Sequence, residues 1–234
     1  WSDMARFARS GGEANAIAIR IARAASGKDQ VAICGYHGWH DWYLAANLGA
    51  SDGLEGHLLP GLDTMGVPKG LRGSVHPFHY NDFAGLTKIV EENDIGVIKM
   101  EVMRDQGPKN NFLQKVRALA SKKGIVLIFD ECTSGFRQTY GGIHKMFDVE
   151  PDMAMFGKAL GNGYAITAVL GRREVMEAAQ RTCISSTFWT ERIGPTAALT
   201  TLEEMERIQS WKAIKETGMG ITQRWKDLGA QYNL

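Results

Sequence analysis

The sequence predicts an α/β domain with a mostly parallel central sheet flanked by helices. Residues 95–100 and 125–129 form short, almost continuously apolar runs, which are typical of strands buried on both faces. Segments with helical periodicity separate these runs, and such alternation indicates βαβ units. The chain has 234 residues, of which 44% are hydrophobic, so it is long enough to bury one large core.

The individual elements follow from period and from flanking turn residues. Residues 13–26 carry apolar side chains at helical spacing and stop before Gly27, a common residue after a helix. Residues 47–77 are rich in glycine, proline and polar side chains, so we expect a long ordered loop there. The other expected elements are strand 31–34, helix 82–92, strand 95–100, helix 112–123, strand 125–129, strands 154–156 and 165–170, and helices 172–180 and 195–207.

Charge and cysteine content narrow the class of protein. The chain has 27 basic and 26 acidic residues, interleaved to a net charge of +1, which indicates neither a nucleic-acid surface nor a membrane surface. No apolar run approaches the length of a membrane span. Cys34, Cys132 and Cys183 lie far apart without C-x-x-C spacing, which favours a reducing, cytoplasmic setting over a disulfide framework.

Asp130 and Lys158 are the strongest candidates for chemistry. Asp130, followed by Glu131, ends the most apolar strand, at the edge where open α/β sheets bind ligands. Lys158 stands in a glycine-rich turn among apolar neighbours, which predicts a desolvated amine. An acid and an amine suit pyridoxal phosphate (PLP), whose ring nitrogen takes an anionic partner and whose aldehyde forms a Schiff base with lysine. The alternatives are that Lys158 is an ordinary solvent-exposed lysine and that Asp130 and Glu131 bind a metal ion.

A phosphate site is expected at the first helix. Ser10 and Glu13 have the spacing of a capping box, which places the helix start at this turn. Gly11 and Gly12 leave backbone N–H groups unobstructed at the positive end of the helix dipole. The alternative is simply a well-capped helix. The G-x-G-x-x-G dinucleotide fingerprint is absent, and the sequence predicts no strand before this turn.

Four further groups are weaker candidates. Tyr36 follows a strand, where its ring would stack on a planar cofactor or pack over the sheet edge. His37, His40 and Asp41 are possible metal ligands, but they lack the i, i+4 spacing of a zinc motif, so no metal site is predicted. Glu101 also follows a predicted strand. It either supports the residues that bind the ligand or is only a charge at the strand end. Residues 185–190 are rich in hydroxyls and either bind phosphate or cap the next helix.

Taken in order, these motifs resemble the class III PLP-dependent aminotransferases of fold type I, close to the branch around glutamate-1-semialdehyde aminomutase. The resemblance runs along nearly the whole chain. It rests on Ser10 to Ala14, Tyr36-His37-Gly38, Tyr80-Asn81-Asp82, Phe129-Asp130-Glu131, Thr133 to Arg137, Pro151-Asp152, Phe156-Gly157-Lys158 with Gly161 and Gly163, and Ser186-Thr187-Phe188.

The resemblance implies a role for each matching residue. Lys158 is the lysine that forms the Schiff base and moves the substrate proton, and Asp130 holds the pyridine nitrogen. Tyr36 stacks on one face of the ring, and Cys132 packs against the other. His37 belongs to the same cofactor-binding set.

The resemblance also implies how the phosphate is bound. Backbone N–H groups of Gly11 and Gly12 bind it, joined by Thr187 from the neighbouring subunit of a homodimer with a shared active site. Glu101 matches a family glutamate near the cofactor. Three positions depart from the family pattern: Gly12 replaces serine or threonine, Cys132 replaces valine, and Val102 replaces proline.

The resemblance implies an aminotransferase acting on a small-molecule amino donor and a keto or aldehyde acceptor. The alternatives are a PLP-dependent 2,1-aminomutase of the glutamate-1-semialdehyde type, a non-catalytic PLP-fold binding module and an NAD-linked enzyme. A binding module would be expected to lack Lys158 or Asp130, and both are present. We expect residues 1–207 to form the cofactor-binding large domain with an incomplete N-terminus, and residues 208–234 to form a helix leading to a small domain outside this chain.

Overall fold

The computed structural model describes residues 1–50, 52–57 and 61–233, and it contains one seven-stranded sheet. The strand order is β1-β7-β6-β5-β4-β2-β3. Strands β3, β2, β4, β5 and β6 are parallel, whereas β7 runs antiparallel to both β6 and β1. The predicted mostly parallel α/β fold is therefore confirmed. The strands are β1 Met4–Ala8, β2 Gln30–Cys34, β3 Val75–Pro77, β4 Ile95–Glu101, β5 Val126–Asp130, β6 Met153–Phe156 and β7 Thr167–Gly171.

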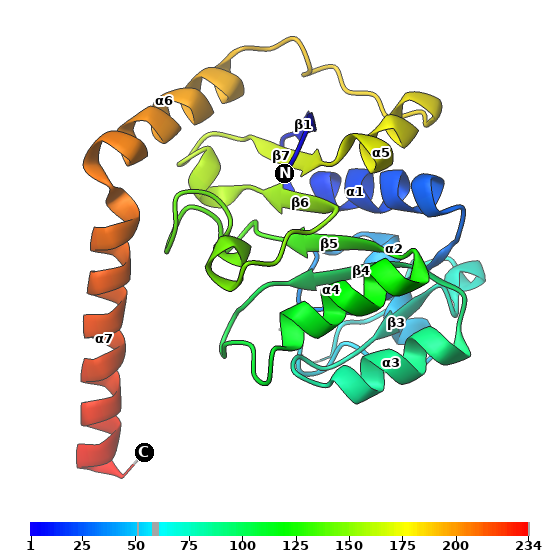
Figure 1. Cartoon of the computed structure of the whole chain (residues 1–234), viewed down its shortest axis with the longest axis horizontal. Helices are drawn as coiled ribbons and strands as arrows, with labels where there is room; N and C mark the ends of the chain where they lie inside the picture. Colours follow the sequence, from blue (N-terminus) through cyan, green and yellow to red (C-terminus); the bar gives the residue numbers. More distant parts are fainter. Residues whose placement is uncertain (51, 58–60, 234) are drawn as a thin grey trace.

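Helices cover both faces of the sheet, as Figure 1 shows. Helix α1 (Gly11–Ser26) packs on one face, and α3 (Phe83–Glu92) and α4 (Phe112–Lys123) lie on the other. Side chains alternate along each strand, so β5 sends Ile128 to the α1 face and Phe129 to the α4 face. Both are fully buried, and each contributes about 1.5–3 kcal/mol to folding. The same alternation places Asp130 on the α1 face.

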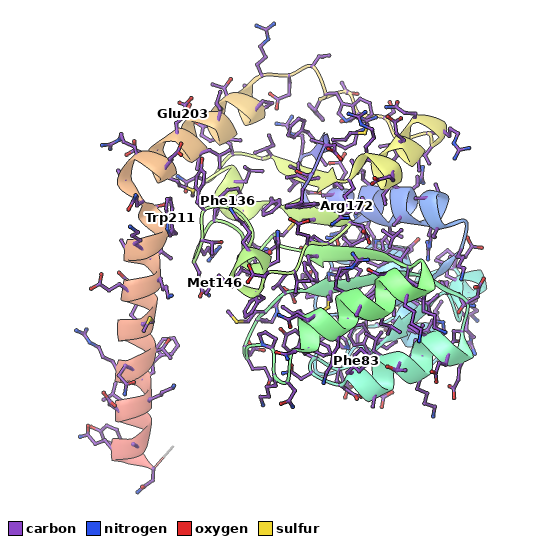
Figure 2. The ribbon with its side chains drawn as sticks, in the orientation of Figure 1. Phe83, Phe136, Met146, Arg172, Glu203 and Trp211 are labelled. Atoms are coloured by element: carbon purple, nitrogen blue, oxygen red, sulfur yellow. The ribbon has the colours of Figure 1, made fainter. Side chains whose placement is uncertain are left out.

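The expected elements have their observed counterparts within a few residues. Helix 172–180 is split into α5 (Arg173–Met176) and a 3-10 turn Glu177–Arg181, and helix 195–207 is α6 (Ile193–Ile208). Helix α7 (Ser210–Tyr232) follows and has no buried residue. In Figure 1 it stands apart from the sheet, to one side of the domain. Trp211, labelled in Figure 2, lies at the start of this helix. Its ring centroid is 5.3 Å from that of Tyr140.

Two expectations about the N-terminal half are wrong. Strand β1 precedes the Ser10 turn, although no strand was expected there. It is a short edge strand whose pairing partner, β7, lies about 160 residues away, and Phe7 on it is exposed. The stretch 47–77 is not wholly a loop, since it contains β3 and a 3-10 helix Lys69–Leu71. Residues 51 and 58–60 of that stretch lie outside the described residues. Among the described helices, none combines the length and hydrophobicity that crossing a membrane requires.

Candidate active site

Asp130 is a buried acid at the carboxyl edge of the sheet. It ends β5 and is 4% exposed. Its Oδ2 lies 2.9 Å from His37 Nδ1 and 3.4 Å from Lys99 Nζ, and its Oδ1 accepts the Cys132 backbone N–H at 3.1 Å. Burial alone would raise the pKa of Asp130, but the Lys99 charge and the two hydrogen bonds outweigh burial and hold this pKa well below its usual range. The carboxylate is therefore ionised at neutral pH.

His37 holds that carboxylate as a neutral imidazole. Its side chain is buried, and burial together with the nearby Lys99 charge lowers its pKa, although Asp130 opposes this shift. A neutral His37 must carry its proton on Nδ1 in order to donate to Asp130. Its Nε2 is then an acceptor, and it has no hydrogen-bond partner among the described residues. His37 thus orients Asp130 without adding a charge.

Lys158 lies in the turn after β6, at the start of a 3-10 helix Lys158–Leu160. Its backbone has φ = +42°, a conformation that costs a non-glycine residue about 1–3 kcal/mol and that is concentrated at functional sites. Its Nζ donates to Thr133 Oγ1 at 3.0 Å. The expectation that its amine is desolvated is wrong for this chain, because the side chain is exposed. Its neighbours Phe156 and Leu160 point into the core instead.

Cys132 connects the aspartate to the lysine turn. Its backbone donates to Asp130, and its Sγ would lie 3.4 Å from a Cβ placed on Gly157, the residue before Lys158. Burial and the Asp130 charge raise the pKa of the Cys132 thiol, while the charges of Lys99 and Lys158 oppose this rise. The charge of Lys158 therefore acts on Cys132, whose backbone N–H is bound by Asp130. The two predicted catalytic residues border the same small region.

The turn before α1 has the expected cap. Ser10 Oγ accepts the Glu13 N–H at 3.3 Å, while Glu13 reaches back to the Arg9 N–H at 2.9 Å. Apart from its two chain neighbours and the nearby backbone of its own helix, no described atom lies within 4 Å of a Cβ placed on Gly11, so this helix end can be approached closely. A Cβ on Gly12 would lie 2.8 Å from His40 Nε2. His40 thus occupies the space of a serine or threonine side chain, which accounts for the glycine at position 12.

The Ser10 turn and the lysine turn share one neighbour on β7. Thr167 is buried, and its Oγ1 donates to the Ser10 carbonyl at 3.3 Å. Its methyl group would lie 3.0 Å from a Cβ on Gly157. Thr167 therefore contacts both turns at the edge of the sheet.

Glu101 ends β4 beside the turn after β2. Its Oε2 accepts the Tyr36 N–H at 3.1 Å, and Arg104 binds both oxygens through Nε at 2.8 Å and Nη2 at 2.6 Å. A Cβ on Gly35 would lie 2.5 Å from Oε2, and Gly35 has φ = +109°, so only glycine fits there. The Tyr36 ring is half-buried and meets Tyr43 edge-on at 6.0 Å between centroids.

Glu131 and Thr187 lie outside this group. The expectation that Glu131 faces the ligand edge is wrong, because successive strand side chains alternate between faces. Its carboxylate accepts the backbone N–H of His144 at 3.0 Å, contacts the Nδ1 of that residue at 2.8 Å and accepts the Ser134 hydroxyl. Thr187 is exposed in the turn before α6, and no hydrogen bond between described residues links it to the other candidates. The described residues contain no group of three possible metal ligands.

Sequence reasoning missed Lys99 and Arg104. Lys99 interrupts an otherwise apolar strand between Ile98 and Met100, a pattern that signals a buried charge. Arg104 is three residues after Glu101, but the pairing depends on how the chain turns after β4. Only the structure shows that these two cations meet the two strand-end acids.

Residues 2–234 match the family model for aminotransferase class-III. The 3-aminobutyryl-CoA aminotransferase of Cloacimonas acidaminovorans is 40% identical over 88% of this chain and 48% of its own length. The glutamate-1-semialdehyde 2,1-aminomutase of Methanocaldococcus jannaschii is 32% identical over 100% of this chain and 56% of its own. An omega-transaminase structure from Sphaerobacter thermophilus has a TM-score of 0.76 and 28% identity, covering 87% of this chain and 50% of that one.

The chain spans about half the length of these relatives. The family match covers nearly all of this chain. The chain belongs to the class III aminotransferases.

Proposed function

We propose that the protein is a PLP-dependent aminotransferase that moves an amino group from a small-molecule donor to a keto or aldehyde acceptor. The observation that carries this proposal is the pair formed by an ionised, buried Asp130 and an exposed Lys158 amine on either side of Cys132. An acid and an amine that both border Cys132 fit the two ends of a pyridine aldehyde. Family membership supports the same cofactor.

The residues present fit PLP. The open N-terminus of α1 at Gly11 suits a phosphate, since backbone N–H groups and the helix dipole favour an anion there. When bound, PLP supplies an electron sink for the carbanion formed at the substrate carbon. Lys158 Nζ holds the cofactor and moves the substrate proton, while Asp130 keeps the ring-nitrogen proton in place. Tyr36 and Cys132 would hold the ring, and Gly12 would offer a second backbone N–H to the phosphate.

His37 and Glu101 support this arrangement. His37 fixes the orientation of Asp130, and Glu101 fixes the turn that presents Tyr36. We also propose a homodimer in which Thr187 of the partner subunit completes the phosphate site. The exposed position of Thr187 in the turn before α6 supports this, because the hydroxyl is accessible to a second subunit. A cytoplasmic location is proposed from the three cysteines, all of which are free.

An aminomutase is the second candidate, because the Methanocaldococcus jannaschii relative bears that name. The relative named as an aminotransferase has the higher identity, 40% against 32%, and this favours amino transfer between two substrates. The two reactions differ in whether the intermediate leaves the site. Conversion of a single amino-aldehyde substrate without any external donor or acceptor would favour the aminomutase.

Borohydride reduction tests the proposed function. The purified protein is mixed with PLP, its visible spectrum is recorded, and the reduced protein is digested and mapped. We expect a visible cofactor band and a stable label on Lys158. K158A should bind PLP without a stable label, whereas K122A, at an exposed lysine on α4, should behave like the wild type. A colourless protein, or a label elsewhere, would refute the proposal.

A further inference from the structure

Lys99 is a buried cation that the proposed chemistry does not yet use. It lies in β4, where every residue is buried, and its own side chain is 0% exposed. Its register partners on the adjacent strands are Ile33 and Ile128, both apolar. Burying an ammonium group is costly unless it is paired, and an apolar residue would satisfy this strand position more easily. A specific role is therefore needed to explain a lysine here.

Strand register directs Lys99 toward Asp130. Lys99 is opposite Ile128, and Asp130 is two residues beyond Ile128, so both charged side chains lie on the α1 face. Lys99 Nζ lies 3.4 Å from Asp130 Oδ2 and donates to Met155 Sδ at 3.0 Å. Met155 is itself the register partner of Asp130 on β6. The ammonium group is thus held in contact with the acid by three neighbouring strands.

Asp130 is the acid with which Lys99 forms an ion pair among the described residues. Glu101, the other acid on this part of β4, is already paired with Arg104 through two hydrogen bonds. His37 is neutral and contributes a hydrogen bond but no charge. The titratable and charged groups around Asp130 are Lys99, Glu101 and Arg104 from β4 and the turn after it, His37 from the turn after β2, Cys132 after β5 and Lys158 after β6.

We propose that Lys99 sets the protonation of the cofactor ring nitrogen by partly neutralising Asp130. This inference rests on the proposed function, in which Asp130 faces that nitrogen. An aspartate paired with a lysine attracts a ring proton less strongly than an unpaired aspartate does. Lys99 therefore lowers the pH at which the ring nitrogen loses its proton, by about 1–2 units for a charge in direct contact with the acid. Lys99 acts through Asp130, so it is a positioning residue that tunes the strength of the electron sink.

The test measures ring-nitrogen protonation directly. Wild type, K99M and K99Q are loaded with PLP carrying ¹⁵N in the ring, and the ¹⁵N chemical shift is followed against pH. Methionine matches lysine in length without its charge, and glutamine keeps a polar end. We expect the titration midpoint to rise by about 1–2 pH units in both variants. K122M, which removes an exposed lysine on α4, should leave the midpoint unchanged.

The outcomes separate this inference from the proposed function. If borohydride labels Lys158 in all variants but the midpoint is the same in wild type, K99M and K99Q, Lys99 has no tuning role and this inference alone fails. A wild type that takes up no PLP overturns the proposed function first. Failure of both variants to fold also counts against the inference, because it would assign Lys99 to the fold. A variant whose unfolding free energy changes while its ¹⁵N titration midpoint does not would also count against the inference.

Discussion

His57 should make the protein less stable at mildly acidic pH. It is 7% exposed, its Nδ1 accepts the Gly35 N–H at 2.9 Å, and its ring stacks on His79. Burial, assisted by His37 and His79, lowers the pKa of His57 from 6.5 to about 4. The unfolded chain therefore binds a proton near pH 6.5 that the folded chain refuses until about pH 4. The contribution of neutral His57 to stability is therefore complete above about pH 6.5 and is lost as the pH falls toward about 4.

The size of the loss follows from the two pKa values. At pH 5 the imidazole of His57 is almost fully protonated in the unfolded chain and mostly neutral in the folded chain. This difference lowers the free energy of unfolding by at most about 2 kcal/mol relative to pH 7. His57 lines a cavity of about 170 Å³, and solvent there screens the charge, so we expect about 1–2 kcal/mol.

Urea unfolding at pH 7 and pH 5 measures this loss, with H57Q as the matched variant. Glutamine offers an oxygen to the Gly35 N–H but does not titrate. H57Q should lose less stability than the wild type between the two pH values, by about 1–2 kcal/mol. Equal losses in the two proteins would refute the assignment of a neutral, buried His57, because some other group would then account for the whole effect.

Two further predictions concern packing. The clash with His40 should lower the unfolding free energy of G12A by about 1–3 kcal/mol, and replacing a helical glycine should return about 0.5–1 kcal/mol of this. In urea unfolding, the additional substitution H40A should remove the clash, whereas additive effects of the two substitutions would show that the two residues do not contact each other. D152A should cost about 1–3 kcal/mol because the Leu127 N–H (2.8 Å) and Arg117 (2.9 Å) lose their acceptor; thermal unfolding checks this, and a D152A protein as stable as the wild type would show that water replaces the carboxylate.

The elements that sequence alone located are those with a strong period and local boundaries. Helix α1 is capped at Ser10 and ends before Gly27, and the first four residues of β5 are all apolar. Strand β1 was missed because a five-residue edge strand becomes a strand only by pairing with distant β7. Strand β3 was missed because it has three residues and ends at Pro77, a residue that sequence analysis associates with loops.

The candidate site shows the same division. Asp130 and Lys158 could be chosen from local context, since each follows an apolar segment at a predicted strand end. The contact between Lys99 and Asp130 could not, because it depends on the register between β4 and β5, which no local pattern encodes. The orientation of Glu131 also depends on which face of the sheet its strand presents, so its burial against His144 became visible only in three dimensions.

Thr167 makes the two ends of the proposed cofactor site mechanically dependent on each other. Its hydroxyl holds the carbonyl at the beginning of α1, and its methyl group supports the glycine that precedes Lys158. A displacement of Thr167 would act on the Ser10 carbonyl and on Gly157 at the same time. One substitution at this position would therefore alter both turns together.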